Sequence, residues 1–191
     1  MNYVHKMTMV AKGKKRNAQG GFTLVELMIV LGIAALLAAV AVMFVPDALA
    51  SIRAGKVTKA LSAGIPSIQT AYQNNTSFNN LTTAQVAQNG WFGKSLTEYA
   101  AGVPTGNLVT PWGAITCTSA SAGMQGQCSL TNIPTRECRK IGEEFTNDLY
   151  IAATVNGTAV KTATTDVDLT AVGTQCSSTA TNTITFNFGR A

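Results

Sequence analysis

The stretch Phe22-Thr23-Leu24-Val25-Glu26-Leu27-Met28-Ile29-Val30 begins the segment that decides the fold of this chain. From Leu27 to Val45 the sequence contains no charged or strongly polar side chain. A helix over residues 22–46 would be about 38 Å long at a rise of about 1.5 Å per residue, enough to cross a hydrocarbon core of about 30 Å with some tilt. The segment therefore predicts a membrane-spanning helix with a single carboxylate, Glu26, near its start.

Basic residues gather ahead of this segment. The formal net charge of the 191-residue chain is +5, and residues 1–21 contain five basic residues and no acidic one. The rest of the chain holds nine basic and nine acidic residues and is neutral. Because positive charge favours the cytoplasmic side, the leader is predicted inside and the C-terminal bulk outside. A neutral remainder also lacks the broad basic footprint of a nucleic-acid-binding protein.

Helical periodicity continues beyond the apolar run and predicts one helix over roughly residues 22–73, apolar on all sides first and on one side later. Four helix breakers lie inside this pattern, and each proline tends to kink the axis or unwind it locally. The breakers are Pro46, Gly55, Gly64 and Pro66. The apolar positions expected to face the rest of the protein are Leu49, Ile52, Val57, Leu61, Ile65, Ile68 and Tyr72.

A secretory signal peptide is an alternative interpretation of the N-terminus. Ala48-Leu49-Ala50 before Ser51 has the small-residue form of a signal-peptide cleavage site. The apolar core is longer than that of a usual signal peptide, and the helical pattern runs straight through the cut. An uncleaved membrane anchor is a third possibility.

The segment Gly21-Phe22-Thr23-Leu24-Val25-Glu26 follows a short basic leader and opens a long apolar helix. In this it resembles the processing site of type IV prepilins and related pseudopilins. The resemblance implies that a prepilin peptidase cleaves between Gly21 and Phe22 at the cytoplasmic face and that the new amino group of Phe22 is N-methylated. Gly20 and Gly21 fit such a site, because they present no side chain to a protease cleft and resist helix formation.

Glu26 is the functional candidate inside the apolar helix. In a monomer it could simply reach the lipid headgroups and interact with the helix N-terminus. When apolar helices pack together, an unpaired carboxylate is strongly unfavourable, whereas pairing with the Phe22 ammonium of an adjacent subunit would fix the axial register. In pilins the glutamate at the fifth mature position is assigned this role, and Glu26 is fifth from Phe22.

Residues 75–191 are predicted to form an α+β head, with an antiparallel sheet laid across the amphipathic half of the long helix. Asn156-Gly157 predicts a type I′ hairpin between strands at 149–155 and 158–164. Residues 182–188 alternate with period two and predict a terminal strand. This strand places Ile184, Phe186 and Phe188 on one face. A short helix is expected from Pro134, in its first turn, through Cys138, Ile141 and Phe145 to Leu149.

Four cysteines, Cys117, Cys128, Cys138 and Cys176, lie on the side predicted to be outside, where disulfides persist. Three pairings are possible. We prefer Cys117 with Cys128, closing the loop 118–127, and Cys138 with Cys176. No metal or cofactor site is expected, because no C-x-x-C pair occurs and the single histidine is in the leader.

The second pair is similar to the disulfide-bounded region of type IVb pilins, in which a cysteine at the start of a short helix is bridged to one just before a terminal strand. Thr110-Pro111-Trp112-Gly113 and Tyr72 also resemble that subgroup. Two features depart from it: Phe22 as first mature residue is more typical of type IVa pilins, and the pair Cys117 with Cys128 is not general. The expected divisions are a leader 1–21, a transmembrane and polymerisation half-helix 22–46, an amphipathic half-helix 47–74 and the head 75–191.

No enzyme is expected. Beyond Phe22 the chain has no histidine, which removes Ser-His and Cys-His nucleophile schemes, and it has neither a P-loop nor a dinucleotide-type glycine motif. The carboxylate pairs Glu143 with Glu144 and Asp166 with Asp168 are interpreted as solvated polar residues, although the second pair could share a strand face or bind calcium in a loop.

The leading interpretation is a pilin that polymerises through its apolar helix into an extracellular filament for adhesion, aggregation or mating-pair contact. The expected partners are copies of itself, the prepilin peptidase, the inner-membrane assembly machinery and, before assembly, membrane lipid; the sequence identifies no host or cell-surface receptor. The precursor is expected in a bacterial inner membrane with its head in the periplasm. The alternatives are a pseudopilin of a type II secretion system and an ordinary periplasmic enzyme or binding protein behind a signal peptide.

Overall fold

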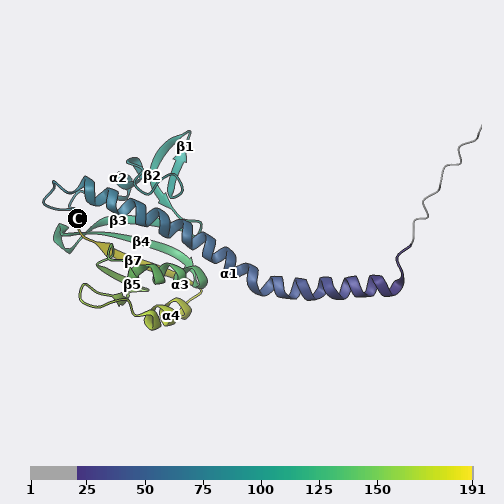
Figure 1. The fold of residues 1–191 in the computed structure, drawn as a ribbon. Helices are drawn as coiled ribbons and strands as arrows, with labels where there is room; N and C mark the ends of the chain where they lie inside the picture. Colours follow the sequence, from purple (N-terminus) through teal and green to yellow (C-terminus); the bar gives the residue numbers. More distant parts are fainter. Residues whose placement is uncertain (1–20, 191) are drawn as a thin grey trace, which may run out of the picture. The chain divides into compact units, whose positions relative to one another are not determined.

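The structure is a computed structural model that describes residues 21–190, drawn in colour in Figure 1. The expectations for the leader up to Gly20 lie outside the described residues. The chain divides into two compact units, Met1–Val42 and Met43–Ala191. One helix, α1 (Leu24–Ala71), contributes residues to both.

In the first unit, α1 is apolar on every side. Every side chain from Phe22 to Val42 is exposed. Among the described residues, α1 is the one helix that is long and apolar enough to cross a membrane. Within residues 21–190 nothing covers this surface, and an apolar surface of this size is unfavourable in water, so it calls for lipid or other chains around it.

In the second unit, one face of α1 packs against the head. The buried apolar side chains are spaced three or four residues apart, as one helix face requires. They are Ala50, Ala54, Val57, Leu61, Ile65, Ile68 and Tyr72. The prediction was wrong for Leu49 and Ile52, which are 45% and 56% exposed. The small residues Ala50 and Ala54 take the head-facing positions in the first two turns, and the two larger residues therefore point away.

The long helix is continuous. Its bounds differ by two residues at each end from the expected 22–73, and it remains helical through Pro46, Gly55, Gly64 and Pro66. The four breakers therefore do not interrupt α1 in the subunit.

The head contains an antiparallel sheet in the order β1-β2-β3-β4-β7-β5-β6. This confirms the predicted α+β class. Figure 1 shows the head-facing half of α1 running across this sheet. The strands are β1 (Thr97–Ala100), β2 (Val103–Val109), β3 (Ala114–Ala120), β4 (Gln125–Pro134), β5 (Ala152–Val155), β6 (Thr158–Lys161) and β7 (Thr181–Phe188).

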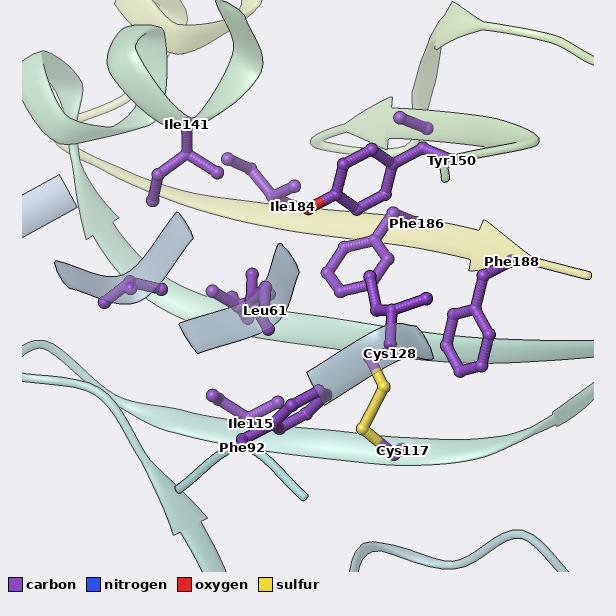
Figure 2. Packing of buried hydrophobic residues seen from close by; sticks show 14 of the residues in the cluster. Leu61, Phe92, Ile115, Cys117, Cys128, Ile141, Tyr150, Ile184, Phe186 and Phe188 are labelled. Atoms are coloured by element: carbon purple, nitrogen blue, oxygen red, sulfur yellow. A yellow bond between two sulfur atoms is a disulfide. The ribbon is translucent and has the colours of Figure 1, made fainter. Parts of the chain in front are cut away.

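The core lies between α1 and the sheet. Leu61 of α1 belongs to the same buried cluster as Ile115 of β3 and Ile184 and Phe186 of β7 (Figure 2). The predicted alternation of β7 is confirmed, because Ile184, Phe186 and Phe188 are all fully buried. Strand β7 pairs with β4 on one side and β5 on the other, so its apolar face lies at the centre of the sheet.

The predicted hairpin is present with shorter strands than expected. Asn156 and Gly157 both have positive φ, 51° and 82°, as a type I′ turn requires. They join β5 to β6. Lys161, the last residue of β6, is buried, and its Nζ donates to the carbonyl oxygens of Phe145 (2.7 Å) and Asn147 (2.9 Å).

The expected helix from Pro134 to Leu149 was too long. Helix α3 is Thr135–Glu143, and a 3-10 turn, η2 (Glu144–Thr146), follows it. Pro134 ends β4 and occupies the N-cap position of α3 instead of lying in its first turn. Phe145 turns inward onto Tyr150, with ring centroids 5.0 Å apart, so the apolar spacing of this stretch reflects core packing beyond the helix end.

Three further helical elements were not predicted, and no individual ranges were predicted for strands β1 to β4. The three helical elements are α2 (Thr83–Gln88), α4 (Leu169–Ser178) and a 3-10 turn, η1 (Ser121–Gly123). Helix α4 contacts β5 and β6, and α2 packs on β2 and β3. Residues 118–127, expected to form a loop, are mostly strand, because β3 and β4 form a hairpin closed by η1.

Candidate functional site

The predicted processing and assembly residues lie at the N-terminal end of α1. Gly21, Phe22 and Thr23 precede the helix, and Phe22 is 80% exposed. The Thr23 hydroxyl accepts a hydrogen bond from the backbone N–H of Glu26 at 3.2 Å, as a helix-capping side chain does. A nonhelical segment therefore leads directly into a capped helix start.

Glu26 lies in the first turn of α1 and is exposed. Within residues 21–190 its carboxylate has no ion-pair partner. Its charge is favourable near a helix N-terminus, where backbone N–H groups point outward. The described residues thus offer an exposed carboxylate about one helical turn from Phe22.

The four cysteines form two disulfides. Cys117 joins Cys128 between directly opposite positions of β3 and β4, and their Cα atoms are 4.1 Å apart. Cys138 joins Cys176 between α3 and α4, with Cα atoms 5.7 Å apart. These are the pairs preferred from the sequence. The first ties two strands of one hairpin, whereas the second ties two helices that are distant in the sequence.

The Thr110–Gly113 segment is a tight turn between β2 and β3. The Thr110 hydroxyl accepts hydrogen bonds from the backbone N–H groups of Trp112 (3.2 Å) and Gly113 (3.0 Å). Trp112 is half-buried against the core. Tyr72, at the end of α1, donates its hydroxyl to Gln85 Oε1 at 2.6 Å, and burial raises its pKa while this hydrogen bond lowers it. The Tyr72 hydrogen bond therefore fastens α2 to the end of α1, and Trp112 packs the β2–β3 turn on the core.

One carboxylate of each pair considered in the sequence has a structural partner. Glu143 Oε2 lies 3.3 Å from Lys140 Nζ. Asp168 caps α4, accepting from the backbone N–H groups of Thr170 (2.9 Å) and Ala171 (3.0 Å). In the part of the chain that the structure describes, no cluster of three or more His, Cys, Asp or Glu residues could hold a metal ion.

Tyr150 is a buried tyrosine that belongs to the core. Burial raises the pKa of Tyr150, with opposing effects from the Ser62 hydroxyl, which lowers it, and Glu144, which raises it. Its ring packs edge-on against Phe145 and Phe186, with centroids 5.0 and 5.2 Å away. Tyr150 therefore has the surroundings of a packing residue.

Sequence reasoning missed the contacts between α1 and α3. Arg136 Nε lies 3.1 Å from Asp47 Oδ1, and Arg53 Nη1 lies 4.0 Å from Glu137 Oε1. The two pairs follow one another along α1 just after its apolar half. The amphipathic spacing of α3 could have suggested a helix with a basic outer face, but its position beside α1 depends on the tertiary fold.

Comparisons with known proteins match the N-terminal segment and the rest of the chain to two separate family models. A family model described as the prokaryotic N-terminal methylation motif matches residues 16–42, and one described as PilS N terminal matches residues 52–188. A crystal structure of a type IV b pilin from Salmonella typhi is similar at 17% identity and a TM-score of 0.51, covering 71% of this chain and 99% of that chain.

A crystal structure of TcpA, a type IV pilin from the Vibrio cholerae El Tor biotype, has 14% identity and a TM-score of 0.49 over 71% of this chain and 98% of that chain. No curated protein matches this chain. The second family match covers most of the sequence, and the first structure supports the fold.

Proposed function

Because the chain belongs to the PilS N-terminal family and has the fold of a type IVb-like pilin, we propose that it is the structural subunit of a type IV pilus. The observation that carries this proposal is the combination of an N-terminal methylation motif with a wholly exposed apolar helix that continues into a folded, disulfide-bonded head. A chain of this form can wait in a membrane and later bury its helix among copies of itself.

In this proposal the prepilin peptidase removes residues 1–21 and the amino group of Phe22 is methylated. The position of Phe22 just outside the helix supports this, since a protease needs an extended segment and α1 begins only at Leu24. The head then lies in the periplasm and, after assembly, outside the cell. Adhesion, aggregation or mating-pair contact is the proposed role of the filament, and no catalytic activity forms part of it.

The processing step predicts a defined mature N-terminus. We expect N-terminal sequencing and mass spectrometry of protein from cells to give N-methylated phenylalanine at Phe22. Ser51 as the first residue would instead identify an ordinary signal peptide and contradict the pilin proposal. Cleavage there would also separate Asp47 from its ion pair with Arg136 and remove the head-packed Ala50.

The assembly step depends on Glu26. In a bundle of α1 helices its carboxylate is proposed to accept the Phe22 ammonium of a neighbouring subunit. Breaking a buried ion pair by removing one partner costs about 3–5 kcal/mol, because the other charge stays buried and unpaired. We therefore expect Glu26→Gln to reduce surface filaments more than a hundredfold, as measured by shearing and immunoblotting.

The matched control is Glu144→Gln, which removes an exposed carboxylate from the head and should leave filament yield unchanged. The Glu26→Gln chain should still carry methylated Phe22 in the membrane fraction, which separates a defect in assembly from one in processing. Normal filament yield with Glu26→Gln would show that the pairing role is wrong.

A pseudopilin of a type II secretion system would share the same N-terminus and the same Glu26 requirement. Imaging distinguishes the two: abundant extracellular filaments containing this subunit support the pilin, whereas short periplasmic filaments needed for exoprotein release would contradict it.

A further inference from the structure

A groove lies between α1 and α3 in the second unit, at the point where the apolar run of α1 ends. It has a volume of about 600 Å³ and is lined on the α1 side by residues from Phe44 to Ser51. On the α3 side it is lined by Arg136, Arg139 and Lys140. The α1 wall of the groove thus contributes an aromatic side chain, Phe44, and the α3 wall contributes three cations.

The position of this groove relative to a bilayer follows from the helix itself. Phe44 and Val45 are the last residues of the apolar run, and Asp47 follows them. The α1 wall of the groove, residues 44–51, spans about 10 Å at about 1.5 Å per residue. The headgroup layer on each side of a bilayer is about 5–7 Å thick. When the apolar half of α1 spans a membrane, residues 44–51, which form the α1 wall of the groove, directly follow the hydrocarbon-spanning run in sequence and so fall at the level of the headgroups.

The cations have unused hydrogen-bonding capacity. Arg136 faces Asp47 through Nε, and Arg139 donates through Nη2 to the Ser177 hydroxyl. Among the described residues no hydrogen bond is made by the terminal nitrogens of Arg136. All three basic side chains are exposed, so their remaining N–H groups can reach phosphate oxygens, which the planar guanidinium binds in a bidentate manner.

Two carboxylates face the same groove and moderate its charge. Asp47 pairs with Arg136, and Glu143 pairs with Lys140. Three cations against two carboxylates leave an excess of one positive charge. The groove should therefore hold a phosphate group reversibly, which suits a subunit that must later leave the membrane.

We propose that this groove binds the phosphate headgroup of an anionic phospholipid while the subunit is anchored in the membrane. Phe44 contacts the start of the acyl chain, and Arg136, Arg139 and Lys140 hold the phosphate. The proposal rests on the proposed function, in which α1 anchors the subunit before assembly. Its consequence is that the lipid fixes how the α3 side of the head meets the membrane surface.

Full-length protein in nanodiscs, one chain to a disc, provides the test. Discs of phosphatidylcholine alone are compared with discs that also contain phosphatidylglycerol, and amide hydrogen exchange is followed in α3 (Thr135–Glu143). We expect exchange in α3 to be about fivefold slower with phosphatidylglycerol, the factor for one net basic residue at an anionic surface. The difference should shrink as salt is raised.

Three sets of variants locate the effect. Arg136→Gln with Arg139→Gln and Lys140→Gln should abolish the difference between the two lipids. The control Lys56→Gln with Lys59→Gln and Lys94→Gln removes the same charge from exposed lysines away from the groove and should retain it. The double variant Arg139→Gln with Lys140→Gln keeps the ion pair between Arg136 and Asp47, so a change in its exchange does not come from loss of that contact. It should lose most of the difference between the two lipids.

The outcomes separate this inference from the proposed function. A chain that does not enter discs would contradict the membrane anchor and both proposals. An inserted chain whose α3 exchanges equally in both lipids would overturn the groove proposal alone. Protection that appears only with several chains in a disc, whatever the lipid, would also overturn it and identify a second copy of the chain as the occupant.

Discussion

Replacing Cys138 and Cys176 together with serine is expected to lower the free energy of unfolding of the head by about 4 kcal/mol. The bridge closes a loop with a sequence separation of 38, and the chain-entropy model gives this value for a loop of that length. It also holds α4 on α3, and α4 has few other strong anchors because Val172 and Cys176 are its only buried residues. A domain's whole stability is typically about 5–15 kcal/mol, so much of it would be lost.

Urea denaturation of detergent-solubilised protein, followed by tryptophan fluorescence, measures this effect. The matched control replaces Cys117 and Cys128 with serine. That bridge has a sequence separation of 11 and joins strands already paired in one hairpin, so its removal should cost about 1 kcal/mol less. An equal or larger loss in the control would show that loop closure does not determine the stability of this head.

The second large effect is expected at Gly64, which lies against the Trp91–Phe92 segment after α2. A Cβ at this position would lie 2.2 Å from Phe92 Cδ1 and 2.6 Å from the carbonyl oxygen of Trp91. The carbonyl is backbone and cannot rotate away. Gly64→Ala should therefore destabilise the head by about 1–3 kcal/mol, the usual cost of overpacking, despite the better helix propensity of alanine.

Gly55→Ala in the same helix is the matched control. A Cβ there would meet no atom within 4 Å, so only the helix propensity changes. This variant should be more stable than the original by about 0.5–1 kcal/mol. Thermal or urea unfolding of both variants measures the contrast, and a Gly64→Ala protein as stable as Gly55→Ala would mean that the Trp91–Phe92 segment yields easily.

The elements that could be predicted from the sequence are those in which the spacing of apolar residues, or the residues of a turn, allows one structure only. The apolar run of α1 must face hydrocarbon or other helices, and β7 must alternate because one face lies on the core. Asn156-Gly157 was recognisable because few residue pairs accept two positive φ angles.

The elements that were missed have weak patterns of their own. Helix α4 is short, contains Thr, Gly and Ser, and buries only Val172 and Cys176, so it depends on its disulfide and on the Asp168 cap. That cap was a usable signal for the start of α4. Leu49 and Ile52 were misplaced because hydrophobicity alone does not tell a head-facing position from one that faces lipid or another chain.

The candidate site was predictable in one part only. Phe22 and Glu26 lie in one short motif, so their proximity follows from the sequence. The ion pair between Asp47 and Arg136 does not follow from the sequence. It depends on the tertiary fold, in which α3 follows β4 and lies beside α1.

Lys161 has a consequence for how this protein can and cannot self-associate. It ends β6, an outer strand of the sheet, and its buried ammonium binds two carbonyl oxygens inside the head. Short outer strands and inward-pointing charges discourage a sheet from adding strands of another molecule. Both outer strands, β1 and β6, are only four residues long. Addition of strands from another copy is therefore disfavoured at both edges of the sheet, whereas the apolar surface of α1 from Phe22 to Val42 stays exposed for association through the helix.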